Sequence, residues 1–313
     1  MAEPTAPVGV APRLTSQEAQ ALALREGLHQ MGVRPPLSRY VRAVWGRRSF
    51  VWNLSASRAY ARNQGSYLGQ AWTVLKPMLD AATFIIIFAF VFPGATAGIN
   101  NRAGFIVVGT FAYSLFQAGV TGGLTAIPTN IDLIRSHQFP RAVVPLSTAM
   151  TETVLFAPQL VAMVILVVVT GFIPDTAKGI TPYAFPTWSW LLLPIAAVLL
   201  AVFSSGLALF FSRLGARTPD IANVVPFVLS LGRYASGVMF FLPQMMGSHS
   251  WFRPIILGQP VVVFLDLFRS VFGNEPSIPM TWSLWLQATA WAVGVFAIGL
   301  IFFWRSEATY GRD

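Results

Sequence analysis

Long apolar runs constrain this chain more than any other feature of its sequence. Each of six runs is close to the length, roughly 20 residues, that an α-helix needs to cross the hydrocarbon core of a bilayer. The runs cover residues 72–92, 103–127, 143–172, 188–211, 221–242 and 281–304. The pattern predicts an all-α polytopic membrane protein in which residues 72–304 form a transmembrane domain of six helices.

The composition favours the same class. Only 11% of the residues are charged, against about 25% in a typical soluble domain, and the mean hydropathy is +0.61. The net charge is +9, and the basic residues flank the apolar runs. This placement favours anionic membrane lipids as partners and disfavours nucleic acid.

Several classes of chemistry are excluded or disfavoured. The chain contains no cysteine, which excludes disulfides and thiolate metal sites. Its histidines, His29, His137 and His249, are scattered, so no metal site is expected. The sequence has no phosphate-binding loop, nucleophile elbow or His-Glu-x-x-His motif. We therefore expect no catalytic residues and no cofactor in this chain, so that energy for transport must come from a partner or an ion gradient.

The first 71 residues precede the first span. Residues 1–36 are expected to form a cytoplasmic tail, which is rich in Pro and Ala as far as residue 14. A capping box at Thr15–Glu18 predicts a short helix that ends near Gly32. No apolar core of a signal peptide precedes the first span.

Residues 37–71 alternate basic with aromatic and apolar side chains. This pattern predicts an amphipathic helix in the cytoplasmic membrane interface, with arginines at the headgroups and aromatic rings at the acyl boundary. The residues that carry the prediction are Arg39, Arg42, Trp45, Arg48, Trp52, Arg58, Tyr60 and Arg62. A nucleic-acid patch is the alternative, and the long apolar spans that follow disfavour it.

The longest polar interruption between spans covers residues 128–145. Its apolar positions, Ile131, Leu133, Ile134 and Phe139, predict a short amphipathic helix near 129–142 that lies on the membrane surface. Such a helix, held between two spans, is where a partner could push on the membrane domain.

A second irregular region covers residues 243–280. It is mostly apolar but contains Pro254, Gly258 and Pro260, which predicts two half-length helices broken at 258–260. Non-helical backbone at this depth must be shielded by protein or lie in a water-filled cavity, as in a re-entrant segment. Asp266 and Arg269 are three residues apart and could pair on one helix face.

The distribution of Lys and Arg predicts the orientation. With both termini in the cytoplasm, including the tail 305–313, most basic residues flank the spans on the inner side. The residues near 129–142 are then cytoplasmic and the segment 243–280 is external.

Charged residues also occur within or beside the spans. Lys76 and Asp80 are four apart, so they share a helix face and could pair. Arg233 lies deep in a span, at a cost of roughly 2.5–3.5 kcal/mol. It either faces a pore or pairs with Glu152 or with a backbone carbonyl.

Two motifs resemble those of a known family. The run from Tyr60 to Pro77, YARNQGSYLGQAWTVLKP, is similar to the segment that leads into the first span of type-2 ABC exporter permeases. Phe139-Pro140-Arg141, followed by Pro145, resembles a motif that these permeases carry after their second span. Lys76 departs from the pattern, because many members have Asn there.

The resemblance implies a function and an assembly. Within this family the chain is most similar to subunits that export lipid-linked polysaccharides such as O-antigens, teichoic acids and galactans. Its Pro- and Ala-rich N-terminus suggests a high-GC actinobacterium and a galactan cargo. Two copies would form the pore, and two separate ATPase subunits would bind ATP and Mg²⁺.

The resemblance also implies roles for particular residues. The helix of residues 37–71 would gate entry of the lipid headgroup. Coupling to the ATPase would fall to Asn130, Asp132, Arg135, His137, Phe139, Pro140 and Arg141. The substrate pathway would include Trp72, Tyr113, Phe116, Arg233, Tyr234, Asp266 and Arg269.

Other functions remain open from the sequence. An exporter of small amphipathic drugs or lipids shares the same family resemblance. An ion-coupled secondary transporter would usually show inverted repeats and midplane ionisable groups, and no repeat is evident. A membrane enzyme acting on polyprenyl lipids would need acidic or metal-binding motifs, which are absent.

Overall fold

A computed structural model of the chain describes residues 35–90, 99–136, 139–172, 185–245, 251, 253–273 and 275–307. The chain divides into two compact units, Met1–Pro35 and Pro36–Asp313, and every described helix belongs to the second. The helix expected near Thr15–Glu18 lies outside the described residues.

The described chain is helical throughout, and no strand occurs in the ranges above. Five helical segments are long and apolar enough to cross a membrane. They are α4 (Ala71–Phe90), α5 (Arg102–Ala126), α7 (Val143–Gly171), η2 with α8 (Trp188–Leu192 and Leu193–Arg217) and α13 (Trp282–Trp304). The chain is therefore an all-α multi-pass membrane protein, as predicted.

The helix at the predicted fifth span, residues 221–242, is shorter than expected. It is α9 (Ile221–Ala235), an apolar helix of 15 residues. At 1.5 Å per residue this helix is about 22 Å long, shorter than the roughly 30 Å hydrocarbon core. The helix ends because Gly237 adopts a left-handed conformation (φ +74°), and the chain then continues through α10 (Leu242–Met245).

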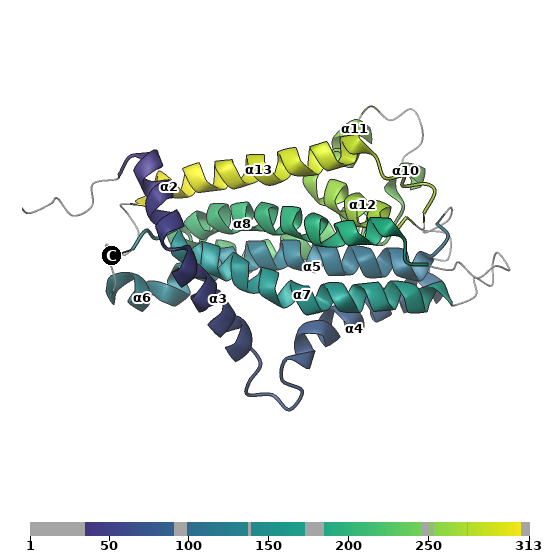
Figure 1. Cartoon of the computed structure of the whole chain (residues 1–313), viewed down its shortest axis with the longest axis horizontal. Coiled ribbons are helices and arrows are strands. Elements are labelled where there is room, and N and C mark those ends of the chain that lie inside the picture. The colour runs from purple at the N-terminus through teal and green to yellow at the C-terminus, as the bar shows by residue number, and fades with distance from the viewer. Residues whose placement is uncertain are drawn as a thin grey trace, which may run out of the picture. The chain divides into compact units, whose positions relative to one another are not determined.

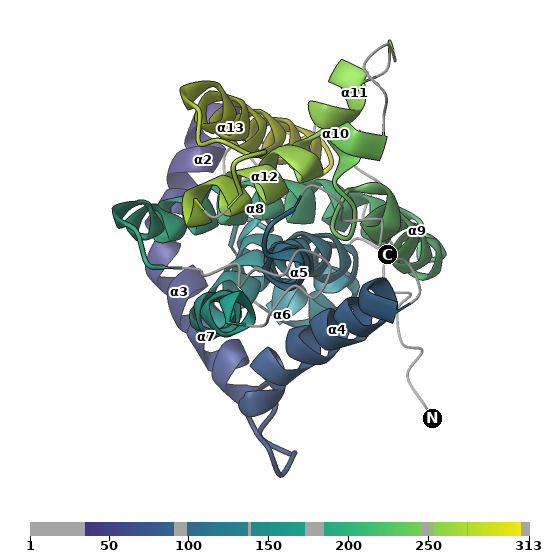
Figure 2. The same ribbon diagram turned by 90° about the vertical axis from the view of Figure 1, so that its right-hand side faces the viewer.

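Helix α5 is the centre of the bundle. It is the only one of the five long segments that is mostly buried, and α4, α7, α8 and α9 surround it (Figure 2). Small residues allow the backbones to approach closely: a Cβ at Gly123 would lie 2.6 Å from the Cα of Ala208 in α8. Helix α13 packs on the outer side of α8, where Gly206 and Gly299 face each other.

One end of the bundle carries α2 (Leu37–Gly46), α3 (Arg48–Ala61), η1 (Pro128–Asn130) and α6 (Ile131–Ser136) (Figure 1). We call it the α6 end. The interface helix predicted over 37–71 is two helices, because the chain leaves helical geometry at Arg47 after Gly46, a poor helix former. Turns then occupy residues 62–70. The amphipathic helix predicted near 129–142 is η1 and α6, with Ile134 buried and Asp132 exposed.

The opposite end carries α10 and α11 (Arg253–Leu257) (Figure 1). The predicted break at 258–260 separates α11 from α12 (Pro260–Phe272), whose residues from Val262 onward are nearly all buried. Arg269 is only 4% exposed. It donates to the carbonyls of Gly237 (2.9 Å) and Val238 (3.0 Å), so it satisfies the backbone where α9 ends.

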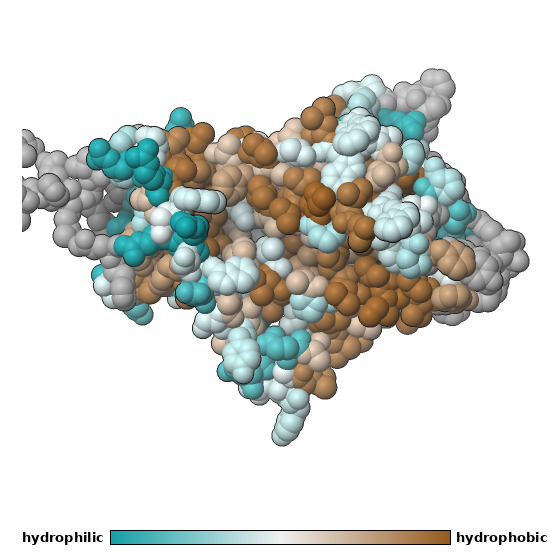
Figure 3. Space-filling view, in the orientation of Figure 1, coloured by the Kyte–Doolittle hydropathy of each residue, from teal (hydrophilic) through white to brown (hydrophobic). Residues whose placement is uncertain are grey.

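Hydrophobic and hydrophilic side chains are distributed over the surface as expected for a chain in a membrane. A hydrophobic band covers α7, α8 and α13 on the face shown in Figure 3, whereas hydrophilic residues gather over α2 and over the turns between α3 and α4. Lipid tails would cover the band, and the hydrophilic regions mark the interface with water.

The glycine contact between α8 and α13 gives a test of the packing. We expect Gly299→Ala to destabilise the protein by about 1–3 kcal/mol, because its Cβ would clash with the backbone of Gly206. Gly294→Ala on the same helix is the matched control, since nothing lies within 4 Å of a Cβ there. Thermal unfolding in detergent, followed by fluorescence-detected size exclusion, measures both. Equal midpoints for the two variants would contradict the close packing.

Candidate functional site

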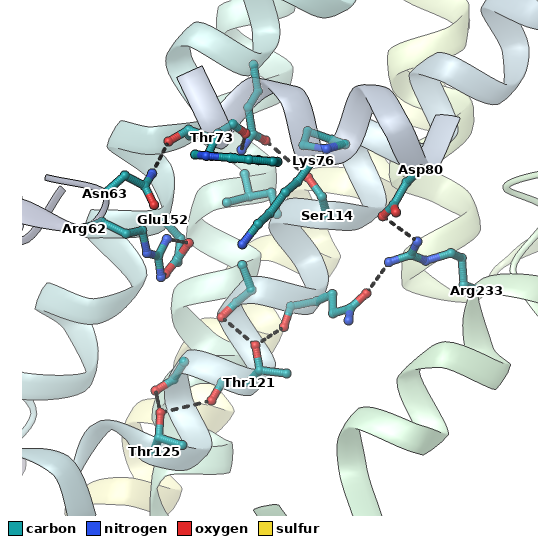
Figure 4. Close-up of a pocket in the computed structure, with 17 residues that line it drawn as sticks. Arg62, Asn63, Thr73, Lys76, Asp80, Ser114, Thr121, Thr125, Glu152 and Arg233 are labelled. Carbon is teal, nitrogen blue, oxygen red and sulfur yellow. Dashed lines mark hydrogen bonds and ion pairs between the residues drawn. The ribbon is translucent and has the colours of Figure 1, made fainter. Parts of the chain in front are cut away.

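A polar cleft of about 650 Å³ lies between α4, α5, α7, α9 and the turn that follows α3 (Figure 4). Hydroxyl and amide groups make up much of its lining, together with charged residues and one indole. The residues are Arg62, Asn63, Trp72, Thr73, Lys76, Pro77, Asp80, Ser114, Leu115, Gln117, Ala118, Thr121, Gly122, Thr125, Glu152, Gln159 and Arg233. In a domain that is otherwise apolar, so many hydrogen-bonding groups in one hollow indicate a path for a polar ligand.

One wall of the cleft carries a bidentate ion pair. Arg62, just after α3, donates Nη1 to Glu152 Oε2 on α7 at 2.7 Å and Nη2 to Oε1. The hydrogen bond to Glu152 raises the pKa of Arg62. Glu152 therefore has Arg62 as its partner, which excludes Glu152 from the alternatives left open for Arg233.

The opposite wall carries a second pair. Arg233 on α9 donates to Asp80 on α4 (3.2 Å) and to Oε1 of Gln117 on α5 (2.5 Å). The guanidinium also lies 5.3 Å from the ring of Tyr113. Lys76 and Asp80 share a helix face, as their spacing predicts, but they do not pair, because Asp80 binds Arg233. Within the described residues, Lys76 makes no hydrogen bond or ion pair.

The cleft is connected to the α6 end through α3. Arg58, one turn before Arg62, donates Nη2 to Asn130 Oδ1 in η1 (2.5 Å) and Nη1 to the hydroxyl of Ser147 on α7 (3.1 Å). Burial lowers the pKa of Arg58. A movement of η1 and α6 would therefore act directly on the helix that ends at the cleft.

A second set of contacts joins α2, the segment after α6 and the end of α13. The hydroxyl of Tyr40 donates to Glu307 Oε2 (2.6 Å) and accepts from the N–H of Ala142 (3.1 Å). The N–H of Arg141 donates to Glu307 Oε1 at 2.8 Å. Burial raises the pKa of Glu307, and the hydrogen bonds from Tyr40 and Arg141 oppose that rise. We call Tyr40, Arg141, Ala142 and Glu307 the Tyr40 cluster.

Comparison with known proteins identifies the family. The model of the ABC-2 type transporter family matches residues 52–273, more than two thirds of the chain. The chain belongs to this family. The matched range contains the whole lining of the cleft, together with α6.

Within this family, the chain is similar to permeases of polysaccharide export systems. The O-antigen export system permease protein RfbA of Myxococcus xanthus is 26% identical over 270 residues, which are 86% of this chain and 97% of that protein. RfbA of Klebsiella pneumoniae is 27% identical over 213 residues, 68% of this chain and 76% of that protein. The polysialic acid transport protein KpsM of Escherichia coli is 23% identical over 192 residues, 60% and 70% of the two chains.

The predicted pathway residues fall into two groups. Trp72 and Arg233 line the cleft. The others contact neighbouring parts of the fold. Tyr113 is buried and donates to the carbonyl of Leu229 (2.6 Å), and Phe116 stacks on Phe203. Tyr234 packs edge-on against Phe84.

Asp266 and Arg269 form the predicted pair, at 3.4 Å, away from the cleft. The guanidinium of Arg269 lies 3.3 Å from the ring centroid of Phe105 and bonds carbonyls, so these contacts hold α12 against α5 and the end of α9. The role of Asp266 and Arg269 in the substrate pathway stays a prediction.

The predicted coupling residues gather at the α6 end. Asp132 and Arg135 are exposed on α6, and Pro140 is in the turn before α7. The ring of Phe139 lies 5.7 Å from that of Phe50 on α3, so this segment also contacts the interface helices. His137 lies outside the described residues.

The predicted interface residues point in two directions. Arg58 and Arg62 reach η1, α7 and the cleft, as described above, whereas the others are exposed on the outer surface. These are Arg39, Arg42, Tyr60, and three residues that line an apolar groove of about 710 Å³ between α2, α3, α7, α8 and α13, namely Trp45, Arg48 and Trp52.

Sequence reasoning missed Tyr40 and Glu307. Tyr40 lies within the amphipathic stretch 37–71, and its partner is 267 residues away. No local pattern marks such a contact. In the described ranges there is no group of His, Asp or Glu side chains that could hold a metal ion.

The Tyr40 cluster can be tested by removing one hydroxyl. We expect Tyr40→Phe to destabilise the protein by about 1–3 kcal/mol, because the buried N–H of Ala142 and the carboxyl of Glu307 both lose a partner. Tyr60→Phe is the matched control, since Tyr60 is 71% exposed. Thermal unfolding of the two variants measures the difference, and an unchanged midpoint for Tyr40→Phe would show that the cluster contributes nothing to stability.

Proposed function

We propose that this chain is the transmembrane subunit of an ATP-driven exporter that moves a lipid-linked polysaccharide from the cytoplasmic to the outer side of the inner membrane. The observation that carries the proposal is the polar cleft inside the membrane domain. Its hydroxyl and amide groups can exchange hydrogen bonds with sugar hydroxyls, and the indole of Trp72 offers an apolar surface for a sugar ring. The relatives named for O-antigen export and polysialic acid transport support the same cargo class.

The energy comes from a separate ATPase subunit that binds ATP and Mg²⁺. Helix α6 is suited to contact it, because Asp132 and Arg135 are exposed while Ile134 anchors the helix in the bundle. The Arg58–Asn130 contact then carries a movement of α6 to α3 and to the Arg62–Glu152 pair at the cleft. In this proposal α6 is the coupling helix.

A second copy of the chain completes the pathway. Helices α4 and α9 flank the cleft, and both carry large apolar side chains that are exposed in the single chain. These residues are Leu79, Ile86, Ile87, Val224, Phe227, Val228 and Leu231. Burying them against a second copy would enclose the cleft between two chains, so the assembly is a homodimer with two ATPase subunits.

In this proposal the interface helices α2 and α3 contact the membrane lipids. The exposed arginines of α2 and α3 lie at anionic headgroups, and the apolar groove beside Trp45 and Trp52 accommodates acyl chains. The turns at residues 62–70 connect these helices to α4, next to the cleft. They therefore lie where a lipid-linked headgroup would enter. Both chain termini are in the cytoplasm in this arrangement.

Co-purification tests the partner. We expect the full-length chain, isolated in mild detergent from its source bacterium, to carry an ATPase subunit in a one-to-one ratio with itself, as quantified by mass spectrometry. The absence of any ATPase at that ratio would reject the ATP-driven exporter in favour of an ion-coupled transporter. Glycosyltransferase genes beside the ATPase gene would favour a polysaccharide over a small amphipathic drug.

Substitution at the α6 end tests the coupling. We expect Arg141→Ala and Phe139→Ala to reduce export of the surface glycan at least several-fold while ATP hydrolysis continues, because contacts with Glu307 and with Phe50 are lost. Arg217→Gln, which removes an exposed charge from the end of α8, is the control. Normal export by both variants would exclude these residues from coupling.

A further inference from the structure

Lys76 is the one cationic group of the cleft that has no partner within the described residues. Three cations and two carboxylates line the cleft. Arg62 binds Glu152 in a bidentate pair, and Arg233 binds Asp80 and Gln117. Lys76 makes no hydrogen bond or ion pair in the described chain, so the cleft has an excess of one positive charge and that charge is at Lys76.

The geometry of α4 directs Lys76 into the cleft. Trp72, Thr73, Lys76, Pro77 and Asp80 all line it, and their spacing places them on one face of the helix. Lys76 is one turn from the indole of Trp72 and one turn from Asp80. Figure 4 shows Lys76 between the Arg62–Glu152 pair and the Asp80–Arg233 pair.

Lys76 is exposed in the single chain, where water can satisfy its ammonium group. When cargo in the cleft displaces that water, the charge has an energetic cost unless an anion satisfies it. The two carboxylates of the cleft are already engaged by arginines, so satisfying Lys76 internally would require breaking one of those pairs. An anion in the cleft would satisfy the three N–H donors of Lys76 and balance the excess charge without disturbing either pair.

We propose that Lys76 binds an anionic group on the transported molecule, either a phosphate of its lipid carrier or a carboxylate of its sugars. The proposal rests on the proposed function, since it assigns a charge to the cargo of the same cleft. It makes Lys76 a specificity-determining residue that selects acidic over neutral cargo. The hydroxyl and amide groups around it then contact the uncharged part of the ligand.

Binding measurements on the purified complex in phosphatidylcholine nanodiscs test this assignment. The probes are farnesyl diphosphate for a lipid phosphate, tetragalacturonate for a sugar carboxylate and maltotetraose as the neutral control. We expect one of the two anionic probes to bind the wild-type complex. Lys76→Gln should weaken that probe on the order of tenfold, the effect of removing one charge-assisted hydrogen bond.

Matched variants separate recognition from folding. Lys76→Arg keeps the charge and should retain affinity within about threefold, whereas Arg217→Gln removes a charge elsewhere and should change nothing. Raising the salt concentration should weaken the anionic probe in the wild type and much less in Lys76→Gln. Size exclusion checks that each variant is folded.

The outcomes distinguish the two proposals. Binding of farnesyl diphosphate that is lost in Lys76→Gln assigns the anion to the lipid carrier, and the same result with tetragalacturonate assigns it to the sugar. Equal affinities for wild type and Lys76→Gln, or no binding of either anionic probe, would overturn the role of Lys76. The proposed function would still stand in that case if the ATPase subunit co-purifies and export depends on Arg141.

Discussion

Close packing of the α5 backbone against the backbone of α8 holds the centre of the bundle together. Apolar side chains cannot hold helices together by leaving water once all of them are in lipid, so van der Waals contact between backbones takes on that role. Gly119 and Gly123 on α5, and Gly215 on α8, remove the side chains that would prevent it. The other helices α4, α7 and α9 lie around α5, and together with it they form the walls of the cleft.

Charged residues in this domain are used in two different ways. Arg269 is surrounded by carbonyls and by the ring of Phe105, and its contacts close the backbone at the end of a short helix. Arg62 and Arg233 instead form ion pairs in the walls of the cleft, where each joins its own segment to another helix. Both uses satisfy the charge within the protein. Lys76 has neither kind of partner within the described residues, and for this reason we assign it to contact with a ligand.

The contacts at the α6 end connect the parts that an energy-coupled transporter must move together. Arg58 joins α3 to η1, and Tyr40 joins α2 to the segment after α6 and to the end of α13. Tyr40 and Ile134 belong to one apolar cluster, which packs α2 and α6 against the bundle. The Arg58–Asn130 hydrogen bond then ties α3 to the same end. In the proposed mechanism these helices transmit ATPase movements toward Arg62 and the cleft.

The class of the protein and most of its helices could be predicted from the amino-acid sequence. Apolar runs of bilayer length, the break at Gly258–Pro260 and the amphipathic stretch around Ile134 are local patterns, and local patterns predict helices because each backbone hydrogen bond spans only four residues. The length of α9, the partners of Glu152, Asp80 and Arg233, and the contact of Tyr40 with Glu307 became visible only in the folded chain. Those contacts join residues far apart in the chain, and they depend on how the helices are rotated and how closely their backbones approach.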